Sequence, residues 1–177
     1  ILTFDDFVIL DFGNEKLKYL PCYEVCVPHW LGQSFLQRRL EQEIKHKKED
    51  ETFLIFCAYR SQVEFLKKKF VKEGLSVLSC MGGQTRIFRQ DLLKNPRPDL
   101  ILATTALSHG VNLPILSKIF MMYEVKNKDL WLQMVGRGGR KGEEYVLYHL
   151  DRPFLKNGRE PLFKLLWKDL CFKFLGF

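Results

Sequence analysis

From Glu51 onward, short apolar runs alternate with longer amphipathic segments, and this alternation constrains the fold more than any other feature of the chain. The first run, residues 53–57, is wholly apolar, which is typical of a strand buried on both faces of a sheet. Further strands are expected at residues 76–80, 99–103, 118–123 and 145–150. Short connections between repeated strand and helix units predict an open, mostly parallel sheet with helices on both faces.

The amphipathic segments between these runs predict the helices. Ser61 and Glu64 have the spacing of a capping box, so a helix should begin there and stop at Gly74. A short helical turn is expected after Thr104 and Thr105. The other expected helices cover residues 84–94 and 129–136.

Three segments follow from this pattern. Residues 1–50 are expected to be an interdomain linker with a strand around 17–27 and a leading helix at 28–48, and residues 51–152 to be one α/β domain. Residues 153–177 should form an apolar helix that docks on the core or on a domain missing from this sequence. The chain starts at Ile1 without an initiator methionine, which suggests a piece of a longer protein.

Composition narrows the class of protein. Hydrophobic residues make up 46% of the 177 residues, enough for a globular core, and the net charge of +7 weakly favours a polyanionic partner. The five cysteines are odd in number and lack the spacing of a zinc site, so neither a disulfide framework nor a metal is expected, and the cytoplasm is the natural compartment. No apolar run of about 18 residues is present, so no membrane span is expected.

Phosphate-compatible turns follow three of the expected strands. Hydroxyls, glycines and unpaired N–H groups at helix N-termini favour anions, and in a parallel sheet these turns share the carboxyl edge. Each turn alone also has a simpler interpretation, as an N-cap or an ordinary glycine turn. The residues in question are Arg60 and Ser61, Gly82 and Gly83, and Thr104 and Thr105.

The segment from Gln133 to Arg140 carries two arginines three residues apart among glycines. Planar guanidiniums pair with phosphate oxygens in a bidentate manner and keep their charge, so the pair suits a polyphosphate. On a continuous helix, Gln133, Arg137 and Arg140 would project from one face. The alternative is a helix C-cap at Gly138 and Gly139, followed by cations that complement the helix dipole.

Two segments at this spacing resemble the motor motifs of superfamily 2 helicases. Residues 101–114 resemble motif V, and Gln133 to Arg140 has the Q-x-x-G-R-x-G-R pattern of motif VI. Residues 53–66 stand where motif IV would be. The resemblance covers about residues 51–150 and implies the second of two RecA-like domains. Within the superfamily, the Gly-Val-Asn-Leu-Pro segment at 110–114 resembles Ski2-type helicases. The short gap to motif VI, the polar linker before motif IV and the Thr-Thr start of motif V instead resemble the bacterial late-competence DNA-uptake helicase.

In such motors, ATP with magnesium lies in the cleft between the two RecA-like domains. This sequence has no phosphate loop and no acidic metal motif, so the first domain would bind most of the ATP and the fragment alone should be inactive. The resemblance implies that Arg137 and Arg140 are arginine fingers. It also implies that the nucleotide side includes Gln133, Gly136, Gly110 and Asn112.

The resemblance further implies a track for single-stranded nucleic acid, with DNA favoured, along Arg60, Ser61, Gly82, Gly83, Thr104 and Thr105. Contacts of this kind grip phosphates, so binding should be sensitive to salt and largely independent of sequence. Two alternatives stay open. One is a non-catalytic RecA-like module that binds nucleic acid or acts as a scaffold. The other is an unrelated doubly wound enzyme, which would need a G-x-G-x-x-G turn that residues 57–60 do not offer.

Overall fold

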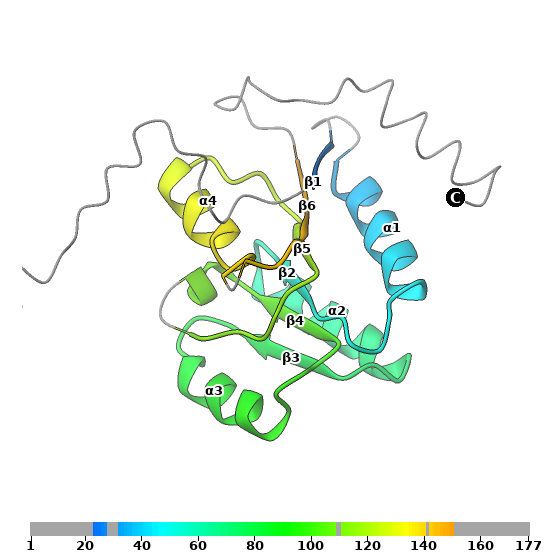
Figure 1. Cartoon of the computed structure of the whole chain (residues 1–177), viewed down its shortest axis with the longest axis vertical. Coiled ribbons are helices and arrows are strands. Elements are labelled where there is room, and N and C mark those ends of the chain that lie inside the picture. The colour runs from blue at the N-terminus through cyan, green and yellow to red at the C-terminus, as the bar shows by residue number, and fades with distance from the viewer. Residues whose placement is uncertain (1–22, 28–31, 109–110, 141, 151–177) are drawn as a thin grey trace, which may run out of the picture.

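The computed structural model describes residues 23–27, 32–108, 111–140 and 142–150, and these residues form a single parallel sheet of six strands (Figure 1). The strand order is β1-β6-β5-β2-β4-β3, and every neighbouring pair is parallel. The strands are β1 (Tyr23–Val27), β2 (Phe53–Phe56), β3 (Val77–Cys80), β4 (Leu100–Ala103), β5 (Lys118–Met121) and β6 (Val146–Leu150). The predicted open parallel sheet is confirmed.

Helices cover both faces of this sheet, as the sequence predicts. Successive side chains of a strand point to opposite faces. Phe53 and Ile55 therefore join the core under α1 (Gly32–Lys45) and α2 (Arg60–Lys72). Leu54 and Phe56 join the other core, under α3 (Thr85–Lys94) and α4 (Lys128–Val135), together with the short 3-10 helix η2 (Thr105–Ser108). Figure 1 shows the α1–α2 pair and the α3–α4 pair on opposite sides of the strands.

The leading strand joins the same sheet as the strands after Glu51, and the leading helix packs on that sheet. β1 pairs with β6 from Tyr23–Val146 to Val27–Leu150, which makes β1 an edge strand. The apolar face of α1 buries Leu36, Leu40 and Ile44 in the first core. Residues 1–22 and the expected C-terminal helix at 153–177 lie outside the described residues.

The start of α2 differs from the predicted capping box. The helix begins at Arg60 with Tyr59 as its N-cap, so Ser61 lies inside the first turn. Gln62 supplies the cap: its Oε1 accepts from the backbone N–H of Ala58 at 3.1 Å and of Tyr59 at 3.3 Å. The expected pairing of Ser61 with Glu64 is wrong because this amide reaches back over the turn and starts the helix earlier.

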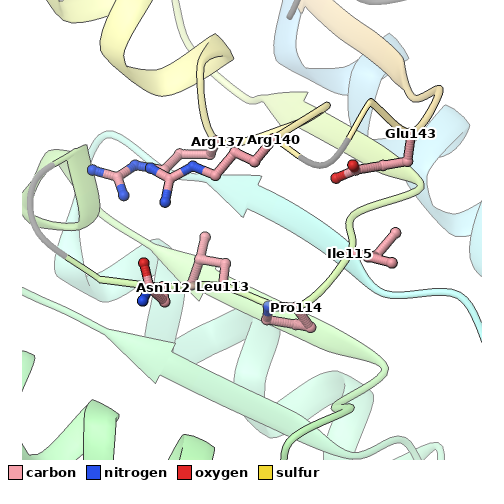
Figure 2. Close-up of a pocket in the computed structure, with 7 residues that line it drawn as sticks. All are labelled: Asn112, Leu113, Pro114, Ile115, Arg137, Arg140 and Glu143. Atoms are coloured by element: carbon pink, nitrogen blue, oxygen red, sulfur yellow. The ribbon is translucent and has the colours of Figure 1, made fainter.

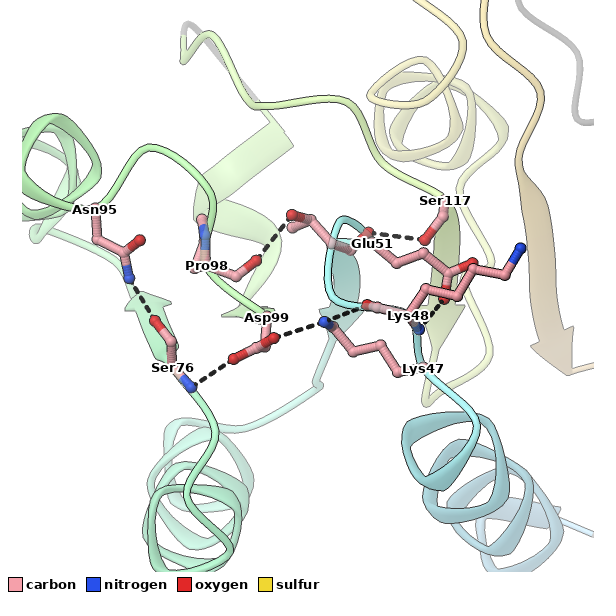
Figure 3. Close-up of polar contacts among 9 residues, drawn as sticks. Lys47, Lys48, Glu51, Ser76, Asn95, Pro98, Asp99 and Ser117 are labelled. Carbon is pink, nitrogen blue, oxygen red and sulfur yellow. Dashed lines mark hydrogen bonds and ion pairs between the residues drawn. The ribbon is translucent and has the colours of Figure 1, made fainter.

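A polar cluster ties the strands together at their amino ends (Figure 3). The Asp99 carboxylate accepts from Lys47 Nζ at 2.5 Å and from the backbone N–H of Ser76 at 2.8 Å. Thr52 donates from Oγ1 to the carbonyl of Pro98 at 2.8 Å. These bonds fix the amino edge of the sheet, and the opposite edge carries the predicted site.

None of the helices in the described part of the chain is long and apolar enough to cross a membrane.

Candidate nucleotide and nucleic-acid site

The carboxyl edge of the sheet brings the three predicted phosphate turns side by side. The N–H of Cys57, after β2, donates to the carbonyl of Ala103 at 2.8 Å, and the N–H of Thr104, after β4, donates to the carbonyl of Cys80 at 3.1 Å. The turns after β2, β4 and β3 are therefore joined in that order along the edge. Thr104 is half-buried and Thr105 exposed, so the second threonine is the more accessible of the two.

Arg60 and Gly82 connect the first and last of these turns. Arg60 is exposed, and its Nη2 donates to the carbonyl oxygen of Gly82 at 2.8 Å. A Cβ on Gly82 would lie 3.2 Å from that same Nη2, so the glycine leaves room for the guanidinium. Gly83 has a φ of +83°, a left-handed conformation that favours glycine. Since a guanidinium carries five N–H donors, Arg60 can keep the carbonyl and bind a phosphate as well.

α4 and the arginine segment depart from the predicted geometry. α4 ends at Val135, and Gly136 is its C-cap, with its N–H donating to the carbonyl of Leu132 at 2.8 Å. Arg137 and Arg140 therefore lie in the turn beyond the helix, and the expectation that Gln133, Arg137 and Arg140 share one helical face is wrong. The cause is local. Tighter bonds, such as Gly138 N–H to Val135 O at 3.0 Å, replace the α-helical ones after Val135.

Glycines let the turn pack against Tyr145, the residue before β6. Gly139 has a φ of +66°, which a side chain rarely adopts. A Cβ on Gly138 would lie 2.8 Å from ring atoms of the buried Tyr145, so only glycine allows this ring to pack against the turn. Tyr145 also donates from its hydroxyl to the carbonyl of Val135 at 3.2 Å. The C-cap is thus Gly136, and not Gly138 or Gly139 as the sequence alternative had it, but Gly138 and Gly139 set the path of the turn that carries both arginines.

The two arginines occupy different environments. Arg137 is only 5% exposed, and its Nη1 donates to the carbonyl of Val111 at 3.0 Å. Burial, and then the charge of Arg140, lower the pKa of Arg137 from its ordinary value. Arg140 is exposed, and its Nε donates to the carbonyl of Gly136 at 3.1 Å. A bound anion would offset the repulsion between the two cations, so this pair suits a polyphosphate.

Both arginines line a hollow of about 340 Å³, which we call the arginine hollow. Figure 2 shows the two guanidiniums extending above Asn112, while the Glu143 carboxylate lies at the other end, near Ile115. The remaining lining residues are Leu113 and Pro114. The structure thus brings Arg137, Arg140 and Asn112 together, as the sequence predicts.

Other predicted nucleotide residues lie elsewhere. Gln133 is exposed on α4 and Gly136 caps that helix, and neither lines the arginine hollow. Gly110 lies outside the described residues. The sequence interpretation missed Glu143, although a carboxylate three residues beyond Arg140 is a signal that could have been used.

A thiol close to this edge offers no nucleophile. Cys57 follows β2 and is buried, and burial raises the pKa of its thiol to about 12. A thiol with that pKa stays protonated at neutral pH, and only the thiolate attacks or binds metal.

Comparison with protein-family models identifies the family of this chain. A model of the helicase conserved C-terminal domain matches residues 36–142, which is more than half of the chain. The chain belongs to this family. The matched residues run from α1 to the turn after Arg140, so they include the three phosphate turns and both arginines. The resemblance to the second RecA-like domain of superfamily 2 helicases is confirmed.

Individual relatives of this helicase C-terminal domain are similar over part of their length. This chain is 30% identical over 96 residues to the ATP-dependent RNA helicase eIF4A of Scheffersomyces stipitis, and the match covers 52% of this chain and 24% of that protein. It is 26% identical over 135 residues to the ATP-dependent RNA helicase DBP3 of Phaeosphaeria nodorum, covering 75% of this chain and 22% of that protein. The chain thus spans about a quarter or less of the curated relatives it matches.

Solved structures share the fold of this helicase C-terminal domain. The yeast DEAD-box splicing factor Prp28 superposes with a TM-score of 0.61 at 21% identity, covering 84% of this chain and 32% of that one. The E. coli DEAD-box protein SrmB, bound to the regulator of ribonuclease activity A, gives a TM-score of 0.59 at 18% identity, covering 75% of this chain and 78% of that one.

Proposed function

We propose that this domain is the second motor domain of an ATP-dependent RNA helicase or translocase. It would close over ATP held mainly by a first RecA-like domain and grip single-stranded nucleic acid along its carboxyl edge. The observation that carries the proposal is the arginine hollow, where Arg137, Arg140 and Asn112 from two distant segments meet. The names of the curated relatives support RNA as the polymer.

The two arginines would divide the work. Arg140 is exposed at the hollow and can reach a γ-phosphate supplied by the other domain, so we assign it the role of arginine finger. Such a finger contributes about 10³ to 10⁵ in rate by stabilising charge in the transition state. Arg137 is buried against Val111, so we assign it mainly to hold the Val111–Asn112 segment beside the turn, with one edge of its guanidinium at the hollow.

The cofactor would be ATP with magnesium. The guanidiniums fit phosphate oxygens, and the amide of Asn112 at the rim can bond to a hydroxyl or phosphate of the nucleotide. Among the described residues, no group of three or more His, Cys, Asp or Glu side chains could hold a metal ion. We assign magnesium to the first motor domain, as the resemblance to superfamily 2 motors implies. The free, buried Cys57 and Cys80 fit a reducing compartment, so we propose the cytoplasm.

The phosphate track would consist of Arg60, the N-terminus of α2 at Ser61, the Gly82-Gly83 turn and the threonines after β4. Its backbone N–H groups and single guanidinium bind phosphate without reading bases. Single-stranded DNA is the second candidate polymer, because the Thr-Thr start of motif V and its short gap to motif VI resemble the late-competence DNA-uptake helicase.

The test is an ATPase assay on the intact protein with no polymer, with single-stranded RNA and with single-stranded DNA. We expect stimulation by RNA, with Arg140→Ala losing hydrolysis while keeping nucleic-acid affinity within a few-fold. Arg97→Ala, an exposed arginine in the loop before Pro98, is the matched control and should hydrolyse normally. Stimulation by DNA alone would favour the second candidate. Absence of hydrolysis in the wild type would leave a non-catalytic binding module.

A further inference from the structure

Tyr59 places an aromatic ring in solvent at the carboxyl end of β2. Tyr59 is 67% exposed, follows the strand by three residues and directly precedes Arg60. We propose that this ring stacks on a base of the bound single strand, next to the phosphate contacts. The inference rests on the proposed function, because it adds a base contact to the same nucleic-acid track.

The backbone that carries the ring is fixed. Tyr59 has an extended conformation, with φ −123° and ψ 149°, and it is the N-cap of α2. The Gln62 side chain accepts from the N–H groups of both Ala58 and Tyr59, which holds the turn at two consecutive residues. Both of these bonds join the Gln62 side chain to backbone N–H groups, so they do not use the tyrosine side chain. The ring is thus presented on a turn that the Gln62 amide holds in place.

Two groups next to Tyr59 could bind the phosphate of a nucleotide. Arg60 is held across the edge by the Gly82 carbonyl at 2.8 Å, and the α2 N-terminus begins at the same point. Under this proposal, a phosphate binds at Arg60 and the α2 N-terminus, and a base of the same strand stacks on the ring of the residue that directly precedes Arg60. Proteins that bind single strands without sequence preference combine this pair of features, a cationic path for phosphates and aromatic rings for bases.

A second exposed aromatic on the same helix provides a control. Phe65 is 61% exposed, close to the value for Tyr59, but it lines a small groove with Gln37, Cys57 and Met122 on the α1 side of α2. It is not adjacent to the Arg60–Gly82 bond in the sequence, and the groove has no arginine or lysine in its lining. An effect that depends on hydrophobic exposure alone would be the same for both residues.

The test uses the intact protein and two single strands of equal length, one with normal bases and one with abasic sugar–phosphate units at every position, measured by fluorescence anisotropy. Stacking predicts that Tyr59→Ala weakens binding to the normal strand by about 5- to 100-fold and binding to the abasic strand by less than about twofold. Tyr59→Phe and Tyr59→Trp should retain affinity for the normal strand, because the π-face and not the hydroxyl is used. Arg60→Ala should weaken both strands alike, since it binds phosphate.

Four outcomes would overturn the inference: equal losses for Tyr59→Ala on both strands, no loss on either, a loss for Tyr59→Phe as large as for Tyr59→Ala, or a loss for Phe65→Ala as large as for Tyr59→Ala. The proposed function fails separately, and would take the stacking with it, if the wild-type protein binds neither strand. Binding of both strands by the wild type with no effect of Tyr59 leaves the motor assignment standing and removes only the stacking.

Discussion

The buried guanidinium of Arg137 donates from Nη1 to the backbone carbonyl of Val111, 3.0 Å away, and so joins two segments that are 26 residues apart. One segment follows η2 and continues into Asn112, and the other follows α4 and continues to Arg140. Residues of both segments line the arginine hollow, so this contact holds the two sides of the hollow opposite each other.

The first prediction separates the two arginines by stability. Arg137→Met removes the donor to a buried carbonyl and should lower the free energy of unfolding by about 1–3 kcal/mol. Arg140→Met changes an exposed side chain and should leave the unfolding midpoint nearly unchanged. Urea unfolding followed by circular dichroism measures both. Equal destabilisation by the two variants would contradict the assignment of Arg137 as the structural partner.

The second prediction concerns the glycine under the Tyr145 ring. Gly138→Ala puts a Cβ 2.8 Å from ring atoms, closer than packed atoms tolerate, and should cost about 1–3 kcal/mol through overpacking. Adding Tyr145→Leu should recover part of that cost, because the two sites are in contact. Thermal unfolding of the two single variants and the double variant gives the coupling. Strict additivity would show that the clash is not with this ring.

The third prediction distinguishes two neighbouring glycines. Gly82→Ala meets only the flexible end of Arg60, at 3.2 Å, so it should shift that guanidinium and weaken nucleic-acid binding with little effect on stability. Gly83→Ala meets no atom within 4 Å but must adopt a φ of +83°, so it should cost about 1 kcal/mol of stability. Anisotropy and thermal unfolding on both variants test the contrast. The reverse pattern would mean that the turn does not position Arg60.

The fourth prediction is a pH dependence set by Glu43 of α1. Burial opposes ionisation of its carboxyl, but hydrogen bonds from Lys118 at 2.7 Å and Tyr148 at 2.8 Å, with the charge of Arg39, outweigh it and lower the pKa below the ordinary value of 4.5. Because the pKa of this carboxyl is lower in the folded protein, the unfolded protein binds the proton more readily than the folded protein. Its contribution to stability is therefore complete above pH 4.5 and is lost as the pH falls through the folded-state pKa.

Unfolding free energies measured across that acidic window should fall more steeply for the wild type than for Glu43→Gln, which cannot titrate. Lys118→Met removes the strongest hydrogen-bond partner, so it should move the loss of stability to higher pH. An identical pH profile for the wild type and Glu43→Gln would show that the network does not stabilise the ionised carboxylate.

Much of the architecture follows from local patterns. Wholly apolar runs such as residues 53–57 and 100–103 predict buried strands, and β2 and β4 lie within them. The division of side chains between the two cores follows from strand alternation. Leu54 and Ile55, for example, point to opposite faces of the sheet, and this does not depend on which strands pair with β2. The turns after these strands were predictable for the same reason, since parallel strands end at a common edge.

The capping of α2 and the end of α4 were not predictable in this way. Ser61 and Glu64 have the right spacing for a capping box, but competition from the Gln62 amide is settled only when the turn folds. In the arginine segment, the sequence keeps the spacing of a helical face beyond Val135, although the helix ends there. The contact between Gly138 and the Tyr145 ring depends on the return of the chain as β6.

The sequence by itself determined the alternation of strands and helices, the edge on which the phosphate turns gather, and the arginine and glycine composition of the motor segments. These are consequences of periodicity and spacing, which act over a few residues. Only the tertiary structure decided the strand order that joins β1 to β6, the burial of Arg137 against Val111, and the meeting of Asn112, Arg140 and Glu143 around one hollow. Those features depend on the approach of segments far apart in the chain, because backbone partners and packed rings, and not local spacing, set the direction of each side chain.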